Sequence, residues 1–451
     1  MSSSFPSPPY EVGLFKSVVE ASPVYRPRAV SEIGVRPAIL EDLALKTLYT
    51  SGTLSVLELA ERLCLSYEVT SSLFSQLRAD MFCQATGMTG HVHQVAMTAN
   101  GRARAVELLA ENHYTGPAPV SLEQYRKQTQ SQKARKTTVH APDVRNGFAH
   151  LVVDNETLRK FGTALNSGSS MFLWGPAGNG KTTMAEALAK VIATDPVWIP
   201  YAVEVDSQII TVYDPSVHKR LTDAEPEERD ARWVLCERPT IVVGGELTAE
   251  MLDLQFNFSS KFYVAPAQLK ANNGVLIIDD FGRQRLRPED LLNRWIVPLD
   301  RRIDFLTLAG GKKIEVPFEM LVVFASNMDP AELVDPAFLR RIQTKIRIGE
   351  VSDEQFCEIF RRVGREKQVT FDSSIPTDLI DYIRINLGQE LRSCYPRDIV
   401  NQVCWAAQYE GRKPHVDRPA LKQAIDAYFL TESESLRRGG EGPAVVSRIC
   451  A

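Results

Sequence analysis

The residues best suited to chemistry lie in the stretch 171–183, MFLWGPAGNGKTT, where three glycines, a lysine and two threonines follow an apolar run. Glycines let the backbone curl so that successive N–H groups point at one anion, which a Cβ would often obstruct. A helix that begins near Gly180 adds its positive end, Lys181 can reach outer phosphates, and the Thr182 hydroxyl can ligate Mg²⁺. The spacing matches G-x-x-x-x-G-K-[ST] completely and predicts a loop that binds nucleotide phosphates. We assign to this loop Gly175, Pro176, Ala177, Gly178, Asn179, Gly180, Lys181, Thr182 and Thr183.

Two further stretches end in polar side chains that could complete such a site. Residues 274–281, GVLIIDDF, read as a strand buried on both faces of a parallel sheet, with carboxylates at its C-terminal end, where ligands bind in open α/β sheets. Asp279 is placed to hold Mg²⁺, directly or through water, and Asp280 to orient an attacking water. A second buried strand, 321–327, ends at Asn327, whose amide could position water near a γ-phosphate.

Three arginines and a hairpin follow in the same region. Gly310-Gly311 lies between two alternating segments of 306–316, LTLAGGKKIEV, and predicts a β-hairpin. The stretch 335–342, DPAFLRRI, places Arg340 and Arg341 after a helical turn, and 394–400, CYPRDIV, places Arg397 at the start of a helix in an all-helical segment.

The composition limits what kind of protein carries these residues. With 451 residues, two or three domains are expected, and 44% hydrophobic and 24% charged residues are typical of a globular protein. The net charge of −4 gives no overall attraction to nucleic acid or to an anionic membrane. The seven cysteines are scattered without C-x-x-C, which favours reduced thiols and no zinc site. The N-terminus lacks a secretory signal and no long apolar window occurs, so we expect a cytoplasmic protein without membrane insertion.

The pattern along the chain predicts an α/β fold in which a parallel-sheet core and a helical lid follow a winged helix-turn-helix domain. The expected divisions are a disordered arm at 1–35, the winged-helix domain at 36–120, a polar basic linker at 121–147, the nucleotide-binding core at 148–350, the lid at 351–430 and a flexible tail at 431–451. In the core, we expect a second strand within 198–205 and a helix over 249–254.

The segment 36–120 shows the order helix, helix, helix, hairpin, helix, which is typical of winged-helix DNA-binding modules. Its charge argues otherwise, because it holds six Lys and Arg against eight Asp and Glu. The second short helix, 67–77, contains no cation, whereas phosphate neutralisation normally supplies most of the affinity for DNA. We therefore favour protein docking over DNA reading. In the linker, RKQTQSQKARK reads as a solvated connection, with a local anion or nucleic-acid contact as the alternative.

The order of motifs, GPAGNGKT, IIDD, a hairpin, ASN, DPAFLRR and a helical segment with PRD, resembles the core of the AAA+ ATPases over roughly residues 148–430. The resemblance implies ATP and Mg²⁺ as ligands and makes the glycine-rich loop the Walker A motif. It implies that Asp279 and Asp280 are the Walker B acids and that Asn327 is the sensor 1 residue.

The same resemblance implies assembly. The family's arginine finger enters the neighbouring subunit's site and would be Arg340 or Arg341, while the sensor 2 arginine would be Arg397. A ring is therefore implied, a hexamer by family resemblance. The hairpin before the sensor strand is similar to that of the branch holding MoxR-type chaperones, Clp unfoldases and enhancer-binding activators. The front module and core together resemble bacterial ATPases with chaperone activity that are associated with Flp pilus assembly.

One residue departs from the family pattern, since most members have Glu where this chain has Asp280, whose carboxylate is one methylene shorter. A water held about an ångström off line can cost on the order of a hundredfold in rate, so slow or assembly-dependent hydrolysis is expected. For force on a substrate, the aromatic residues Phe258, Phe262 and Tyr263 are candidates for a gripping loop, with a place in the core as the equal alternative.

Three functions fit these features. The leading hypothesis is an ATP-driven remodeller or assembly chaperone whose acidic N-terminal module recruits a protein client. The second is a DNA-associated motor or regulator that uses the winged helix and the basic linker. The third is an ATP-bound switch or scaffold with little turnover, which the shorter Asp280 side chain would allow.

Overall fold

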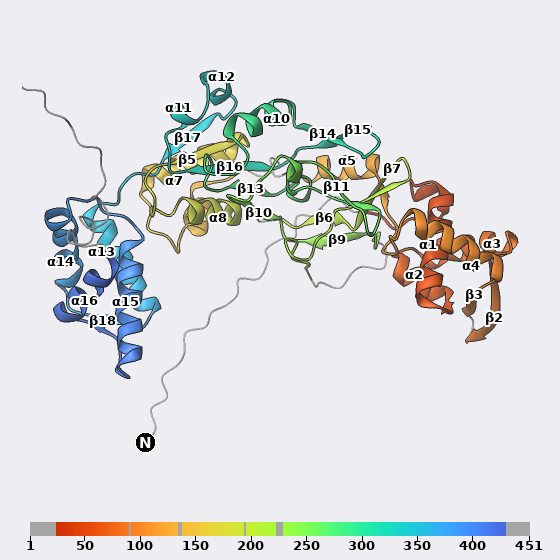
Figure 1. Cartoon of the computed structure of the whole chain (residues 1–451), viewed down its shortest axis with the longest axis horizontal. Coiled ribbons are helices and arrows are strands. Elements are labelled where there is room, and N and C mark those ends of the chain that lie inside the picture. The colour runs from red at the N-terminus through yellow and green to blue at the C-terminus, as the bar shows by residue number, and fades with distance from the viewer. Residues whose placement is uncertain (1–23, 90–91, 134–137, 194, 222–228, 430–451) are drawn as a thin grey trace, which may run out of the picture.

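The chain is built as a central sheet with a helical unit at one end and a second, N-terminal unit at the other (Figure 1). The computed structural model describes residues 24–89, 92–133, 138–193, 195–221 and 229–429. Of the disordered arm predicted at 1–35, residues 1–23 lie outside the described residues, whereas 24–35 are ordered and include a 3-10 turn, contrary to the prediction. The tail predicted at 431–451 lies outside the described residues.

The central sheet has five parallel strands, and all but the edge strand Thr344–Arg347 are short, mostly apolar runs. β13 and β16 are buried along their whole length because helices cover both faces of the sheet. The strand order is β10 (Thr240–Val243), β13 (Val275–Ile278), β16 (Leu321–Ser326), β5 (Met171–Trp174) and β17 (Thr344–Arg347). Since every pairing is parallel, the loops that follow β5, β13 and β16 leave from one edge of the sheet. The α/β class with a parallel sheet is thereby confirmed.

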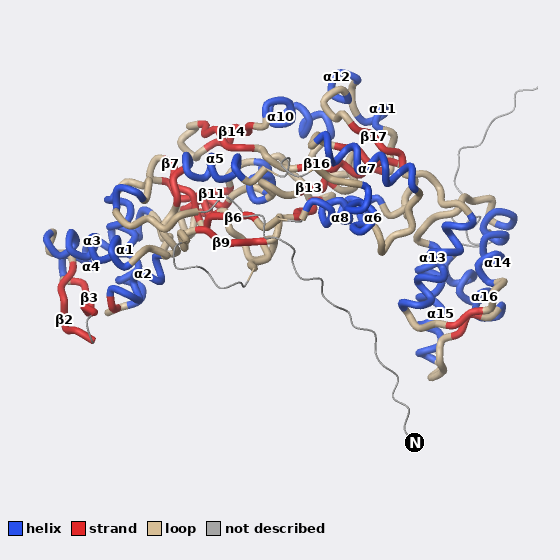
Figure 2. The backbone as a smooth tube through the Cα atoms, turned by 180° about the vertical axis from the view of Figure 1, so that it is seen from behind, coloured by secondary structure: helices blue, strands red, loops and turns tan. Residues whose placement is uncertain are grey.

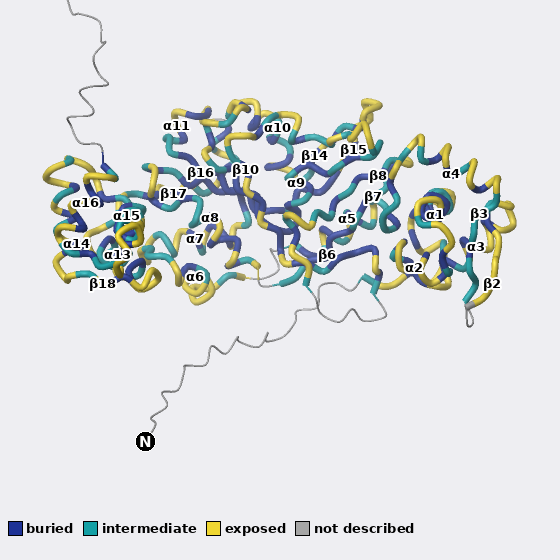
Figure 3. Tube along the Cα trace, turned by 60° about the horizontal axis from the view of Figure 1, so that its bottom comes forward, coloured by how far each residue is buried: buried dark blue, intermediate teal, exposed yellow. Residues whose placement is uncertain are grey.

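Helices cover both faces of this sheet. Alternating residues of a strand point to opposite faces and so contact different helices. Met171 and Leu173 face a cluster with α6, α7 and α8, while Phe172 faces the cluster around Trp295 of α10. The covering helices are α6 (Ala141–Gly147), α7 (Asn155–Ser167), α8 (Lys181–Ile192) and α10 (Pro288–Arg301). Two short helices, α11 (Pro330–Leu333) and α12 (Pro336–Leu339), follow β16. Buried residues run along the strands and the inner helix faces (Figure 3).

A second β-rich unit, which we call the β-module, lies beside the core sheet and was not expected. One of its sheets has the order β11-β12-β8-β7-β4, and two strand pairs, β6-β9 and β14-β15, share its hydrophobic cluster. Its strands are β4 (Val120–Ser121), β6 (Val197–Pro200), β7 (Ala202–Val205), β8 (Gln208–Thr211), β9 (Trp233–Cys236), β11 (Gln255–Asn257), β12 (Phe262–Val264), β14 (Ile303–Thr307) and β15 (Lys313–Pro317).

This module changes three expectations about the core. The strand expected within 198–205 is two strands, β6 and β7, and both pair outside the core sheet. The helix expected over 249–254 is a single 3-10 turn, η3 (Glu250–Leu252), and a short helix, α9 (Ala267–Lys270), follows β12. The hairpin predicted around Gly310-Gly311 is confirmed, with β14 and β15 antiparallel and Gly311 at a φ of +80°.

The connection 121–147 differs from a solvated linker, because part of it is a helix packed on the β-module. α5 (Leu122–Ser131) buries Tyr125, whose hydroxyl accepts a hydrogen bond from Asn272 Nδ2 at 2.7 Å. Three of the linker's cations are engaged within the chain: Arg126 donates to the Glu315 carbonyl, Lys133 pairs with Glu319 at 2.6 Å, and Lys127 pairs with Glu123 of the same helix at 2.6 Å. Residues 134–137 lie outside the described part.

The N-terminal module has the element order that the sequence predicts, with a three-stranded sheet of order β1-β3-β2. Its elements are η1 (Val30–Glu32), α1 (Pro37–Ser51), β1 (Leu54–Ser55), α2 (Val56–Leu63), α3 (Tyr67–Ala79), β2 (Cys83–Thr89), β3 (Val92–Met97) and α4 (Ala99–Glu111). Ser55 and Ser66 cap α2 and α3 by accepting hydrogen bonds from the backbone of the first turn.

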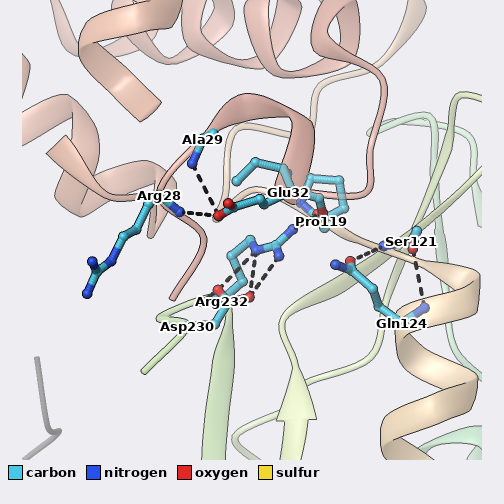
Figure 4. A network of polar contacts seen from close by, with 9 residues as sticks. Arg28, Ala29, Glu32, Pro119, Ser121, Gln124, Asp230 and Arg232 are labelled. Carbon is cyan, nitrogen blue, oxygen red and sulfur yellow. Dashed lines mark hydrogen bonds and ion pairs between the residues drawn. The ribbon is translucent and has the colours of Figure 1, made fainter. Parts of the chain in front are cut away.

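A buried arginine joins this module to the β-module (Figure 4). Arg232, fully buried just before β9, forms an ion pair with Asp230 at 2.7 Å between Nη2 and Oδ2. Its Nη1 donates to the carbonyls of Ile33 at 2.9 Å and Pro119 at 3.1 Å. Asp230 in turn donates its backbone N–H to the carbonyl of Val24. The described part of the arm therefore docks on the β-module.

The C-terminal unit, the lid, is mostly helical and packs around its own hydrophobic cluster (Figure 2). It contains α13 (Asp353–Glu366), α14 (Ile375–Asp381), a π-helical turn η4 (Tyr382–Asn386), α15 (Tyr395–Tyr409) and α16 (Arg418–Tyr428). It departs from the all-helical prediction only in the short parallel pair β18 (Thr370–Phe371) and β19 (His415–Val416), as far as residue 429.

Two absences apply to the described residues alone. None of the helices described is both long and apolar enough to cross a membrane. The described cysteines, which exclude Cys450, form no disulfide.

Candidate functional site

The glycine-rich loop connects β5 to α8 at the carboxyl edge of the sheet, and its glycines are required there. Gly175 has a φ of +141°, and a Cβ at this position would lie 2.1 Å from the carbonyl oxygen of Ile348. Gly178 and Gly180 have φ values of +84° and +74°, which residues with a side chain rarely adopt. The backbone therefore has the curled form that the sequence predicts for an anion-binding loop.

Lys181, the first residue of α8, lies inside this loop and is buried. Its Nζ donates to the carbonyls of Gly175 and Pro176, both at 2.9 Å, and to Asn327 Oδ1 at 2.5 Å. The pKa of Lys181 lies below its ordinary value because the side chain is buried, and the charges of Asp279 and Asp280 offset only part of this shift. The ammonium group is thus held beside two carboxylates in the position where it could bind phosphate oxygens.

The two predicted Mg²⁺ ligands are in contact. Thr182 Oγ1 donates to Asp279 Oδ2 at 2.8 Å, which joins the first turn of α8 to the end of β13. The backbone carbonyl of Asp279 accepts a hydrogen bond from Gln284 Nε2 at 3.0 Å, which steadies the turn that follows the strand. A hydroxyl and a carboxylate are oxygen ligands of the kind that Mg²⁺ prefers, so this pair fits the ion.

Asp280 and Asn327 meet at the ends of the neighbouring strands β13 and β16. Asn327 Nδ2 donates to Asp280 Oδ1 at 3.2 Å, and the other end of the same amide accepts from Lys181. Asp280 is exposed and has a φ of +48°, a conformation unusual for a residue with a side chain. The turn therefore presents this carboxylate to solvent beside Lys181, where it could orient a water.

These side chains line a cleft of about 430 Å³ between the core and the lid. Arg397, in the first turn of α15, lines it from the lid side, as do Ser393 and Asp398. Seven of the nine predicted loop residues line it directly, and the other two, Gly175 and Pro176, contribute carbonyls to Lys181.

The far end of the cleft holds residues that sequence reasoning missed. Apolar residues from the segment before α7 and from α13 lie there, and Arg362 ties the two together by donating to the carbonyls of Ala149 and Leu151 at 2.9 and 3.1 Å. The residues missed at this end are His150, Leu151, Val152, Ile359, Arg362, Val363 and Glu366. They match no motif. The amphipathic pattern of 353–366 is a signal for the four residues on α13, and the three at 150–152 carry none.

Arg340 and Arg341 do not reach this cleft within one chain. They line a different pocket, of about 470 Å³, with Ser169 and Asp300. Arg341 Nε donates to Asp300 Oδ2 at 3.0 Å, whereas Arg340 is exposed and has no ion pair among the residues described.

The three candidate gripping aromatics differ in their surroundings. Tyr263 is buried, and its hydroxyl accepts a hydrogen bond from the backbone N–H of Ala309 at 2.7 Å. Phe262 packs edge-on against Tyr114 of the N-terminal module, with ring centroids 5.6 Å apart. Phe258 is 84% exposed at the turn between β11 and β12. Two of the three therefore serve packing, and Phe258 alone presents most of its ring to solvent.

Comparison with known proteins gives a sparse picture. A family model described as a domain of unknown function, DUF8689, matches residues 352–427, which is the lid. No curated protein sequence matches the chain significantly.

Solved structures of RuvB from Thermotoga maritima are distantly similar. A RuvB mutant aligns with a TM-score of 0.38 and 13% identity, over 61% of this chain and 69% of that chain. The RuvB Holliday junction branch migration motor aligns with a TM-score of 0.35 and 13% identity, over the same shares of 61% and 69%. Another mutant aligns with a TM-score of 0.35 and 12% identity, over 65% and 72%.

Proposed function

We propose that this chain is a Mg²⁺-dependent ATPase of the AAA+ type that works as a ring and remodels a protein client. One observation carries the enzymatic part of this proposal. A glycine-rich loop with its lysine, a threonine–aspartate pair, a second carboxylate and an amide meet at the carboxyl edge of one parallel sheet, under a lid that contributes Arg397. This arrangement is suited to phosphoryl transfer to water, where positioning and charge stabilisation supply nearly all of the catalysis.

Each side chain has a distinct role in this proposal. The loop N–H groups and Lys181 bind the β- and γ-phosphates, and Asp280 with Asn327 orients the attacking water. Thr182 and Asp279 would hold Mg²⁺, which neutralises the phosphate oxygens when bound. The adenine ring of ATP would lie at the apolar end of the cleft, beside Ile359 and Val363.

The arginines support assembly. Arg340 is exposed and lies outside the cleft of its own chain, which is what a residue acting in a neighbouring subunit's site requires. Arg341 is held by Asp300, so Arg340 is the better candidate for the finger. We propose a hexamer from the motif resemblance alone.

The surface of α3 favours a protein client over DNA. Its exposed residues include Glu68, Ser72, Ser75 and Gln76, and Arg78 in the last turn is its only cation. Specific DNA-binding modules obtain much of their affinity from several cations against phosphates, and α3 does not offer them.

The test is the ATPase rate as a function of protein concentration, for the wild-type chain, for Lys181→Ala and for Lys160→Ala. Lys160 is an exposed lysine on α7 and serves as the matched control. We expect a specific activity that rises steeply with concentration, disappears in Lys181→Ala and is unchanged in Lys160→Ala.

Three other outcomes point elsewhere. If a DNA oligonucleotide strongly stimulates the ATPase rate, and salt weakens this stimulation, then the substrate is DNA and not a protein client. If the chain binds ATP tightly but hydrolyses almost none at any protein concentration, and Asp280→Asn changes neither property, then the chain is an ATP-bound switch and not an ATPase. Absence of ATP binding by the wild-type chain would overturn the whole proposal.

A further inference from the structure

The lid contacts the glycine-rich loop directly, through the residues just before α15. The backbone N–H of Ser393 donates to Asn179 Oδ1 at 3.1 Å, and the N–H of Cys394 donates to the Gly178 carbonyl at 2.9 Å. The Ser393 hydroxyl donates to the same carbonyl, also at 2.9 Å. Three hydrogen bonds therefore connect two residues of the loop to two residues of the lid.

The side chain of Asn179 ties a second part of the chain into this contact. Its Nδ2 donates to the carbonyl of Gly349 at 2.9 Å, in the segment that leads from β17 into the lid. The side chain is almost completely buried, with a relative exposure of 1% for the residue. One amide thus bonds both to the entrance of the lid and to the start of α15.

Packing fixes the same contact sterically. A Cβ on Gly178 would lie 2.7 Å from Cys394 Sγ, so the loop accepts the lid at this distance only because residue 178 is glycine. Arg397 follows three positions after Cys394, in the first turn of α15. The position of residues 393 and 394 on the loop therefore determines the position of Arg397 in the cleft.

We propose that Asn179 is a positioning residue that holds the lid on the glycine-rich loop and thereby places Arg397 over the cleft. This inference rests on the proposed ATPase function and adds a residue to it. Hydrolysis depends on the Asn179 side chain through α15, whereas phosphate binding uses the backbone of the loop and Lys181. The Asn179 side chain is therefore needed for turnover more than for affinity.

The test compares Asn179→Ala with Asn166→Ala. Asn166 is a matched control, because its amide also bridges backbone groups, accepting from Val139 N at 2.8 Å and donating to Val139 O at 2.9 Å, away from the lid. Steady-state ATPase kinetics is measured at a protein concentration above which the specific activity no longer rises. Hydrogen exchange is measured without nucleotide on the peptide that spans residues 389–398.

We expect Asn179→Ala to lower kcat by roughly ten- to a hundredfold, the effect of losing two hydrogen bonds, and to change KM for ATP by less than about threefold. Exchange in the 389–398 peptide should become faster. Asn179→Asp keeps the acceptor for Ser393 N but turns a buried carboxylate oxygen toward the Gly349 carbonyl, so its loss in kcat should be at least as large as that of Asn179→Ala. Asn166→Ala should leave kcat, KM and this peptide unchanged.

Other results would overturn the proposal. A raised KM with unchanged kcat would make Asn179 a binding residue, and an equal loss in Asn166→Ala would indicate a general loss of stability. Unchanged exchange in the 389–398 peptide would show that the amide does not hold the lid. If Asn179→Ala fails to fold, Asn179→Ser, whose shorter side chain cannot bond to both Ser393 N and the Gly349 carbonyl, must lower kcat severalfold, and no change there refutes the proposal. A wild-type chain that binds no ATP would refute the proposed function. The exchange measured without nucleotide would then still show whether Asn179 holds the lid on the loop.

Discussion

Replacing Arg232 by methionine should loosen the N-terminal module, by an amount that the structure allows us to work out. The guanidinium and the Asp230 carboxylate are 0% and 4% exposed, and the arginine also satisfies two backbone carbonyls, those of Ile33 and Pro119. Removing one partner of a buried ion pair leaves the other charge without compensation, which costs about 3–5 kcal/mol. We expect Arg232→Met to destabilise the β-module and its contact with the N-terminal module by this amount.

The double variant Arg232→Met, Asp230→Asn separates the pair from the packing. Because the uncompensated charge is gone, it should be less destabilised than the single variant, by about 1–3 kcal/mol. Arg287→Met is the matched control, since Arg287 pairs with Asp290 at 2.8 Å on the surface, with 73% and 45% of the side chains exposed. An exposed pair of this kind contributes little to stability.

The assay is hydrogen exchange of the peptide that covers β9, followed at increasing urea. With a urea dependence of about 2–3 kcal/mol per molar, the exchange transition should move to lower urea by roughly 1–2 M in Arg232→Met. The transition of Arg287→Met should stay near that of the wild type. A shift below about 0.3 M, or a double variant less stable than the single one, would refute the reasoning from the buried charge.

Three further predictions concern other regions. Arg340→Ala should reduce the ATPase rate about a thousandfold and Arg341→Ala much less, as measured in the assembled protein; the reverse order would assign the finger to Arg341. Burial lowers the pKa of Lys46 to about 8 from its ordinary 10.5, so between these values this lysine binds more protons in the unfolded chain. The free energy of unfolding of the wild type relative to that of Lys46→Met, a difference in which the other titrating groups cancel, should therefore rise with pH across this window, as urea titration of both proteins at several pH values checks. Tyr263→Ala should destabilise the β-module by about 3–5 kcal/mol and Phe258→Ala by less than about 0.5 kcal/mol in thermal unfolding, and similar losses would contradict their different burial.

The candidate site could be predicted from sequence because its signals are local. β5, β13 and β16 are short, continuous apolar runs, and each ends at a residue type that a buried strand does not hold: Gly175, Asp279 and Asn327. Parallel strands bring their carboxyl ends to one edge, so the meeting of these residues follows once the sheet is assumed. The lid residues at the far end carry no such signal, since apolar helix residues are more often core.

The β-module could not be predicted because its pairings join distant segments. β4 pairs with β7, and β8 pairs with β12, so residues near 120, 210 and 263 share one sheet. Local alternation indicates a strand but does not identify its partner. Tyr125 lies in a polar run that favours a solvated linker, and only the module packed against α5 explains why the ring is buried.

The Arg232 joint also has a consequence for the order in which the protein can fold during synthesis. Arg232 and Ile33 are 199 positions apart, and Arg232 and Pro119 are 113 apart. At roughly 5–20 residues per second, about 10–40 s pass between the emergence of Ile33 and that of its partner. The core of the N-terminal module also includes Ala202 and Ile209 of the β-module. The N-terminal module therefore waits, with part of its apolar surface uncovered, until the β-module has been made.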